Sequence, residues 1–241
     1  MVHSHFGHVL GIKLDVHKDL VAVGDLMKSV NLLRVDEKQD KLVEIARDFD
    51  PNWITEVRFL SDTEIVAADN LGNIFVLVKQ RDAHFSGGER WTLKIKSGFH
   101  LGEIVNKIER GTLARAGADQ KLEPLLSNRH LIATTSGSIF LLGQVDGPTR
   151  LILEVLQENL RKVLPPVGEL PHGEWRAIAT ERRRCKPDVG CFIDGDLIAK
   201  FLDLDKDARR IVAEGGAACD ATGASVAEVS ILIDNLVAAF Q

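Results

Sequence analysis

Two apolar runs decide the fold: Leu20-Val21-Ala22-Val23-Gly24-Asp25 and, after a short turn, Ser29-Val30-Asn31-Leu32-Leu33. The two runs flank a polar turn that carries Gly or Asp. This pattern predicts an antiparallel β-hairpin. The same arrangement recurs twice downstream, in residues 65–69 with 73–77 and in residues 131–135 with 138–142. Recurrence of one supersecondary unit indicates a repeat architecture.

The spacing of the copies fits the blades of a β-propeller. Leu20 and Ile65 are 45 residues apart, within the period of roughly 40–50 residues of four-stranded blades. The step from Ile65 to Leu131 is longer, at 66 residues. Its excess falls in residues 81–90 and 114–128, which are polar and rich in Gly, Asp and Ser. We predict that both stretches are loop insertions.

Further strands complete the predicted blades. One strand precedes each hairpin, at residues 9–14, 56–60 and 103–109. Another follows each of the first two hairpins, at residues 41–47 and 91–96. No fourth strand is evident in the third copy, because Asp146-Gly147-Pro148 breaks it. A propeller closes radially to protect its strand edges. We therefore expect this chain to be the tail of a larger protein whose earlier blades lie upstream.

After residue 148 the pattern changes to a helical period. Apolar residues recur at helical spacing from Thr149 until Pro165-Pro166 stops the run. Further helices are predicted at residues 173–180, at 192–204 with a cap in Asp194-Gly195-Asp196, and at 226–240 with Ser225 as N-cap. The predicted fold is mainly β with a C-terminal α-helical domain. It comprises a partial, three-blade propeller over residues 1–147 and a small helical domain over residues 148–241.

Composition narrows the function classes without naming one. The 241 residues carry a net charge of −5, so no global field attracts nucleic acid or anionic membrane. No apolar run approaches the roughly 20 residues of a membrane helix, and the N-terminus does not resemble a signal sequence. Three cysteines at irregular spacing argue against a disulfide framework and fit a reducing nucleus or cytosol.

Several possible ligand sites are weak. The cluster His3, His5 and His8 lacks a second ligand group at zinc spacing, and Cys185 and Cys191 do not form a Cys-x-x-Cys pair. Asp194-Gly195-Asp196 lacks the remaining ligands of a calcium loop and is better explained by helix capping. We therefore expect no metal and no cofactor.

The sequence also contains no catalytic motif. It has no phosphate-binding Gly-Lys-Ser/Thr loop, no Gly-x-Ser-x-Gly elbow and no His-Glu-x-x-His. The basic run Glu181-Arg182-Arg183-Arg184 could contact phosphate or an acidic partner. A solvated loop fits better, because the net charge of the chain is negative. We predict that the chain is a binding scaffold and not an enzyme.

Longer motifs carry a family resemblance. The first motif is Gly24-Asp25-Leu26-Met27-Lys28-Ser29-Val30. The second spans residues 44–53 and contains Ile45-Ala46-Arg47-Asp48-Phe49 and Pro51-Asn52-Trp53. The third comprises Gly190 and residues 192–198. On these the chain resembles the C-terminal end of a family of three-propeller proteins. The family includes the large subunits of damaged-DNA-binding protein and of cleavage-and-polyadenylation specificity factor. The segment ending at Trp53 favours the damage-binding adaptor of a cullin–RING ubiquitin ligase.

The resemblance implies a function for this end of the protein. In the family, the first and third propellers form a cleft that grips a helical segment of substrate receptors, and the second propeller holds the cullin. The receptor-binding positions implied here are Leu26, Lys28, Arg47, Trp53, Ile104, Asn106 and Thr135. Ile104 and Thr135 depart from the Phe and Val of the adaptor, which weakens the apolar character of the cleft.

The implied partners are WD-repeat substrate receptors, with the cullin bound only through propellers outside this chain. The resemblance further implies that DNA is contacted indirectly, through a receptor, that no membrane is involved, and that the protein works in the nucleus and also in the cytoplasm.

Residue chemistry supports this interpretation. Arg47 and Trp53 belong to the types most enriched at binding hot spots. Leu26 and Ile104 could line an apolar groove for a helix, with Lys28 and Asn106 at its polar rim. The alternative is that Trp53 and Leu26 are simply blade core.

Two other functions stay open. A nucleic-acid-binding scaffold of an RNA-processing or DNA-repair complex would show salt-dependent affinity for DNA or RNA. The chain could also have no independent activity, because alone it supplies only part of the receptor cleft.

Overall fold

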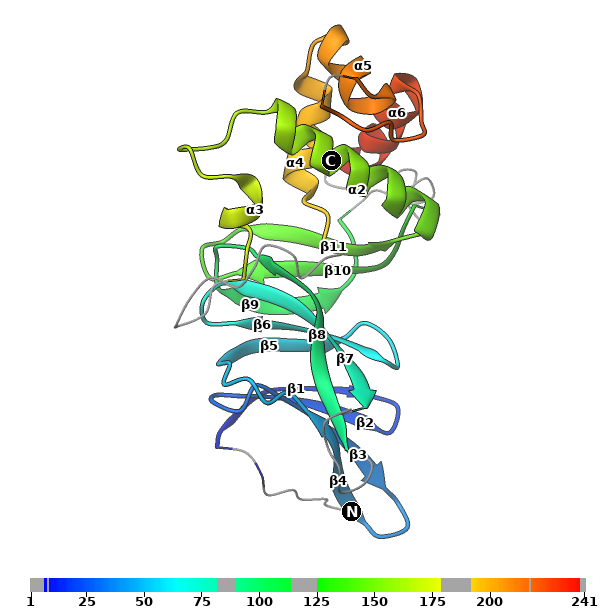
Figure 1. The fold of residues 1–241 in the computed structure, drawn as a ribbon. Coiled ribbons are helices and arrows are strands. Elements are labelled where there is room, and N and C mark those ends of the chain that lie inside the picture. Colours follow the sequence, from blue (N-terminus) through cyan, green and yellow to red (C-terminus); the bar gives the residue numbers. More distant parts are fainter. Residues whose placement is uncertain are drawn as a thin grey trace. The chain divides into compact units, whose positions relative to one another are not determined.

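The computed structural model describes residues 7, 9–81, 90–113, 125–178, 192–216 and 218–238. Strands form its first part, and helices begin at Gly147 (Figure 1). The chain divides into two compact units. The first unit comprises residues 1–109, 132–140 and 176–191, and the second comprises residues 110–131, 141–175 and 192–241. The sequence-based division at residue 147 stays a prediction.

Two four-stranded antiparallel blades form most of the first unit (Figure 1). The first blade contains β1 (Gly11–His17), β2 (Leu20–Asp25), β3 (Val30–Asp36) and β4 (Lys41–Arg47). The second contains β5 (Ile54–Phe59), β6 (Glu64–Asp69), β7 (Asn73–Arg81) and β8 (Trp91–His100). Their last strands, β4 and β8, meet in a parallel bridge between Arg47 and Thr92. Both predicted four-stranded blades are confirmed.

The third copy of the repeat forms a separate sheet with the strand order β11-β10-β9. Its strands are β9 (Val105–Arg110), β10 (Leu126–Thr134) and β11 (Ile139–Val145). Some predicted strand bounds were wrong: β1 starts later than predicted, β8 runs on to His100, and β10 starts before Leu131. Most of the two predicted insertions, residues 82–89 and 114–124, lies outside the described residues.

The faces of the two blades share one apolar core. Because alternate residues of a strand point to opposite faces, Val30 and Leu32 of β3 join Phe75 and Leu77 of β7 in the same buried cluster. The blades also approach each other closely at Gly24, where an added Cβ would lie 2.6 Å from Cγ2 of Ile54. A glycine in a strand interior often marks such an approach.

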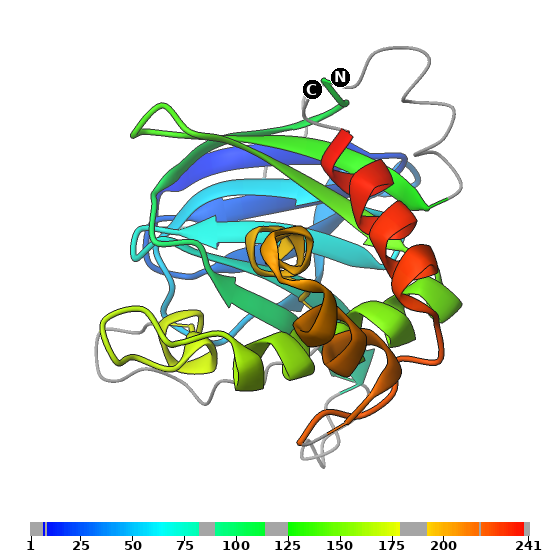
Figure 2. The ribbon, with the colours of Figure 1, turned by 90° about the horizontal axis from the view of Figure 1, so that it is seen from above.

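Short helices make up the core of the second unit. They are α2 (Gly147–Val163), α3 (His172–Trp175), α4 (Gly195–Ala199), the 3₁₀ helix η1 (Lys200–Asp203), α5 (Lys206–Glu214) and α6 (Val226–Val237). Figure 2 shows α4 nearly end-on, with α2, α5 and α6 around it. Their buried side chains include Leu153, Leu156, Leu160, Phe201, Val212 and Ile233.

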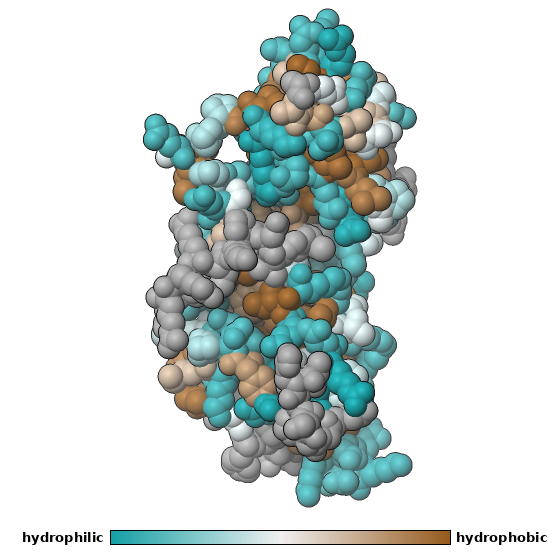
Figure 3. All heavy atoms as spheres, in the orientation of Figure 1, coloured by the Kyte–Doolittle hydropathy of each residue, from teal (hydrophilic) through white to brown (hydrophobic). Residues whose placement is uncertain are grey.

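The helix predictions were mostly confirmed. The periodic run from Thr149 is α2, and residues 192–204 are α4 and η1. The helix predicted at residues 173–180 is only the short α3, and α5 was not predicted. None of the helices described is long and apolar enough to cross a membrane. On the face drawn in Figure 3, apolar side chains reach the surface of the second unit among polar ones.

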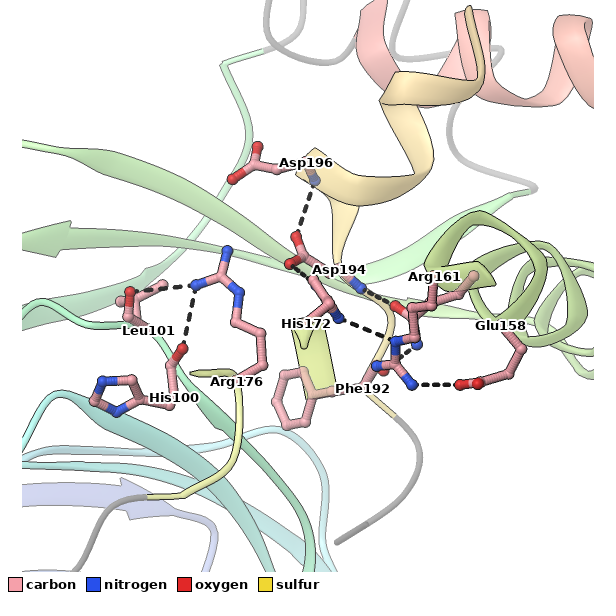
Figure 4. Close-up of polar contacts among 10 residues, drawn as sticks. His100, Leu101, Glu158, Arg161, His172, Arg176, Phe192, Asp194 and Asp196 are labelled. Atoms are coloured by element: carbon pink, nitrogen blue, oxygen red, sulfur yellow. Dashed lines mark hydrogen bonds and ion pairs between the residues drawn. The ribbon is translucent and has the colours of Figure 1, made fainter. Parts of the chain in front are cut away.

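A polar network fixes the connection from α2 to α4 within the second unit (Figure 4). The His172 ring uses both of its nitrogens: Nδ1 accepts from Nε of Arg161 at 3.0 Å, and Nε2 lies 2.8 Å from Oδ2 of Asp194. Asp194 also caps α4, since its Oδ1 accepts the N–H of Asp196. This confirms the predicted capping role, and the network is a structural one.

Ser225 begins α6 as predicted. Its Oγ accepts the N–H of Glu228, whose carboxylate in turn accepts the N–H of Ser225, a complete capping box. We expect Ser225→Ala to lower the free energy of unfolding by about 1 kcal/mol, because one helix N–H loses its acceptor. Urea denaturation followed by circular dichroism measures this. Ser230→Ala, later in the same helix, is the matched control, because the Ser230 hydroxyl donates to the carbonyl of Val226 and does not cap the helix. It should not lower stability, and equal losses in both variants would contradict the capping role.

Candidate partner-binding surface

The hairpin turns of the repeat are built alike. The last residues of β2 and β6 are buried aspartates, Asp25 and Asp69. Oδ1 of Asp25 accepts the N–H groups of Met27 and Lys28, at 2.9 Å each. A carboxylate that accepts backbone N–H groups within its own turn holds that turn in one conformation. The side chains on the turn are therefore presented from a fixed backbone.

The other two turns follow the same plan. Oδ1 of Asp69 accepts the N–H groups of Leu71 and Asn73, at 2.9 and 3.0 Å. In the third copy a threonine replaces the aspartate, and Oγ1 of Thr134 accepts the N–H of Ser138 at 3.1 Å. Glu103 supplies the missing carboxylate there, accepting from Oγ1 of Thr134 at 2.6 Å and Oγ of Ser138 at 2.9 Å.

Backbone hydrogen bonds join these turns to the connections between blades. The N–H groups of Ser29 and Asn70 donate to the carbonyls of Asn52 and Trp53, at 3.1 and 3.0 Å. The N–H of Leu101 donates to Gly72, and that of Thr135 to Ile104, at 2.9 Å each. Residues 26–29, 48–53, 70–72, 101–104 and 135–138 thus form a continuous loop band at one end of the blades.

A buried carboxylate stiffens the middle of the loop band. Oδ2 of Asp48 accepts from Oγ of Ser29 at 2.6 Å and from Nδ2 of Asn52 at 3.3 Å. Burial raises the pKa of Asp48 despite these hydrogen bonds. At Glu103, by contrast, the hydroxyl donors Thr134 and Ser138 lower the pKa of the carboxyl. The sequence placed Asp48 in a motif but did not indicate this bracing.

Five of the predicted receptor-binding residues lie in the loop band. Trp53 and Ile104 are 49% and 41% exposed, so both apolar side chains are accessible to a partner. Thr135 is exposed, while Leu26 and Lys28 are half-buried. The loop band therefore brings together residues that are more than 100 positions apart in the chain.

Arg47 and Asn106 lie beside the loop band. Arg47 ends β4, and its Nε and Nη2 each donate to the Glu44 carboxylate at 2.8 Å. The hydrogen bond to Glu44 raises the pKa of Arg47, so its positive charge is already balanced. Asn106 is an exposed residue of β9 whose carbonyl accepts from Nζ of Lys13 at 3.3 Å.

Two exposed apolar residues of the loop band, Met27 and Phe49, were not among the predicted positions. Met27, between Leu26 and Lys28, is 61% exposed, and Phe49 is 48% exposed. The Phe49 ring lies beneath two guanidinium groups, 5.6 Å from Cζ of Arg47 and 4.2 Å from that of Arg90. Cation–π contacts of this kind fix an exposed ring in place. Their position within the motifs quoted above could have indicated both residues.

Charged pairs connect the first strands of the blades, outside the loop band. Nζ of Lys13 lies 3.1 Å from Oε2 of Glu56, and Nη1 of Arg58 lies 2.8 Å from Oδ1 of Asp15. Arg58 also pairs with Glu109. Burial disfavours the Arg58 cation, but Asp15 and Glu109 outweigh it and raise its pKa. Because these ions are mutually paired, they stabilise the fold and leave no charge for a ligand.

Comparison with known proteins identifies the family. The family model of the CPSF A subunit region matches residues 2–203. The chain belongs to this family. Over 88% of its length, the chain is 34% identical to DNA damage-binding protein 1b of Arabidopsis thaliana. It is 33% identical over 97% of its length to DNA damage-binding protein 1 of Oryza sativa subsp. japonica. A third relative, from Solanum lycopersicum, is 35% identical over 85% of this chain.

The matches cover 19%, 20% and 18% of these three relatives, so the chain spans about a fifth of the length of the curated relatives it matches. Family membership confirms the resemblance found in the motifs. The activities and partners of the full-length relatives belong to those larger proteins.

Other predicted features fall outside the described residues. They are His3, His5 and His8, Cys185 and Cys191, and the basic run from Glu181 to Arg184. Within the part of the chain that the structure describes, no three His, Cys, Asp or Glu side chains gather as metal ligands would.

Proposed function

We propose that the loop band docks a helical segment of substrate receptors in a cullin–RING ubiquitin ligase. The chain would act as the receptor-docking part of an adaptor scaffold that serves DNA repair and protein ubiquitination. The observation that carries the proposal is the exposure of Trp53, Met27 and Ile104 on loops held by the carboxylates of Asp48, Asp25 and Glu103. Support also comes from family membership and from the names of the relatives, which are DNA damage-binding proteins.

The chemistry of the loop band favours a helix as the ligand. An amphipathic helix presents apolar anchors at positions i, i+3, i+4 and i+7, which need separate apolar contacts along one surface. Trp53 and Ile104 lie in different connections of the loop band and could each receive one anchor. Lys28 and Arg47 lie at its edge and would favour acidic residues flanking those anchors. Because Arg47 already pairs with Glu44, its contribution should be smaller than that of Trp53.

The proposal extends to the larger protein. WD-repeat substrate receptors would bind the loop band, and the cullin would bind propellers outside this chain. DNA would be contacted through a receptor, and the protein would work in the nucleus and also in the cytoplasm. A scaffold of this kind needs no catalytic group.

The test uses the full-length protein that contains this chain. Tagged protein is incubated with nuclear extract, and captured WD-repeat proteins and cullin are quantified by mass spectrometry. We expect Trp53→Ala to reduce receptor affinity about 30-fold, because truncation of a central aromatic anchor typically costs at least 2 kcal/mol. Cullin capture should not change. Calorimetry with a purified receptor then measures the affinity.

Val16→Ala is the control. Val16 is an apolar residue outside the loop band, is 58% exposed, and pairs with Val21 near the end of the β1–β2 hairpin that lies away from Asp25. Val16→Ala should therefore leave receptor capture unchanged. Equal capture by wild type and Trp53→Ala would contradict the proposal. Salt-dependent retention of DNA by the isolated chain in filter binding would instead favour the nucleic-acid-binding alternative.

A further inference from the structure

A pocket of about 300 Å³ opens between the first and second blades, and none of its lining residues belongs to the loop band. Leu20 begins β2 and Trp91 begins β8, whereas the loop band follows the other ends of these two strands. Its volume is at the lower end of the roughly 300–1,000 Å³ of ligand pockets. The apolar side chains of its wall are Leu20, Leu32, Ile45, Phe59, Ile65 and Leu93.

Of the charged side chains at the pocket, Arg34 and Asp62 each have an oppositely charged partner. Arg34 pairs with Asp19 at 3.1 Å, and both groups are largely in solvent. Asp62 accepts from Nζ of Lys18 and lies against Nε2 of His17, each at 2.6 Å. The Lys18 and His17 contacts lower the pKa of Asp62, and they satisfy its charge outside the pocket.

Lys79 is the exception. No carboxylate among the described residues lies within ion-pair distance of its ammonium group, which instead lies over the ring of Trp91, 4.6 Å from the centroid. Burial, together with the positive charge of Arg34, lowers the pKa of Lys79. Two cations therefore line one half-enclosed apolar space. Arg34 has Asp19 as its counter-charge, whereas Lys79 has no ion-pair partner among the described residues.

We propose that this pocket binds a small organic anion with an apolar body. The anionic group, a carboxylate, sulfonate or phosphate, would lie between Lys79 and Arg34, and the body would contact Phe59 and Ile65. An anion there would give Lys79 a charged partner, which no described carboxylate supplies, and the apolar body would cover the part of the pocket wall that is still open to water. The volume suits a body of about two fused rings. This site is separate from the loop band and does not depend on the receptor-docking proposal.

The probe is 2-naphthoate, titrated into the full 241-residue chain by calorimetry. We expect saturable binding at one site, and at least tenfold weaker binding of the neutral 2-naphthalenemethanol. Lys79→Met keeps most of the aliphatic stem and removes the charge, and it should also weaken 2-naphthoate binding at least tenfold. Methyl NMR shifts at Leu32 and Ile65 would report the location.

Lys94→Met is the matched control, because Lys94 is exposed on β8 next to Leu93 and points to the other face of the sheet. It should leave the affinity within twofold of wild type. Thr63→Trp adds bulk at an exposed position of the pocket mouth and should block binding. Absence of saturable 2-naphthoate binding would overturn the proposal, as would equal affinity for the alcohol, or Lys79→Met and Thr63→Trp variants that both bind like wild type. Circular dichroism would establish that each variant is folded.

Discussion

Gly24→Val is expected to lower the free energy of unfolding by about 3 kcal/mol, at the upper end of the usual cost of overpacking a core. Gly24 is buried in β2, and a Cβ there would lie 2.6 Å from Cγ2 and 3.2 Å from Cβ of Ile54, which is fully buried in the next blade. The backbone conformation of Gly24 is not the obstacle, because its φ lies outside the left-handed region. The penalty comes from pushing the two blades apart.

A double-mutant cycle in urea denaturation tests this cause. Ile54→Ala removes the atom that the new side chain would meet, so the double variant should be more stable than the sum of the two single losses predicts, by at least about 1 kcal/mol. Gly195→Ala is the matched control, since no atom lies within 4 Å of its added Cβ. Strict additivity would mean that Gly24 is needed for another reason. Because Trp53 precedes Ile54, the Gly24 variant should also weaken receptor docking.

Alternation of apolar and polar residues was enough to predict the hairpins and both complete blades. Strand ends were harder, because β8 continues through Ser97 and Gly98, residues that read as a turn. Pairing with β7 overrides that local signal. Helix α5 was missed because Lys206, Asp207, Arg209 and Arg210 make its first turns polar, and only its packing on α2 and α6 reveals the buried face.

The loop band could be predicted only in part. Motif resemblance implied Leu26, Trp53 and Ile104, but the bonds that place them in one surface join backbone groups. Backbone N–H and carbonyl groups are present at nearly every position, so such bonds leave no signature in sequence. The sequence also did not indicate that Thr134 takes the place of Asp69 in the third hairpin turn, because the carboxylate there comes from Glu103 in another loop.

Asp25→Ala should have the second large effect, a loss of about 3 kcal/mol at pH 7. The Asp25 carboxylate accepts four backbone N–H groups, those of Val9, Leu10, Met27 and Lys28. Alanine leaves these donors without the carboxylate, and the net contribution of a hydrogen bond to a charged group is about 1.5–3 kcal/mol. The donors are only partly buried, so water replaces some of the lost bonds and limits the total. Asp69→Ala, in the equivalent turn of the second blade, should cost about 2 kcal/mol, because its carboxylate accepts from fewer donors.

The two aspartates should respond to pH in opposite directions. At Asp25 burial favours the neutral acid, but the four N–H donors outweigh it and lower the pKa. Its stabilising contribution is therefore present above the ordinary pKa of Asp and is lost as the pH falls through the lowered value. At Asp69 burial outweighs the hydrogen bonds from Asn73 and Leu71 and raises the pKa. Its contribution is full below the ordinary pKa and decreases as the pH rises through the raised value.

Urea denaturation of wild type, Asp25→Ala and Asp69→Ala between pH 7 and pH 3 separates the two effects. As the pH is lowered, the loss of stability caused by Asp25→Ala should shrink, while the loss caused by Asp69→Ala should grow. Equal pH profiles would mean that the turns are not electrostatically distinct. The contrast matters for docking, because Asp25 anchors the turn that carries Leu26, Met27 and Lys28. Acidification should therefore loosen that part of the loop band and weaken receptor binding.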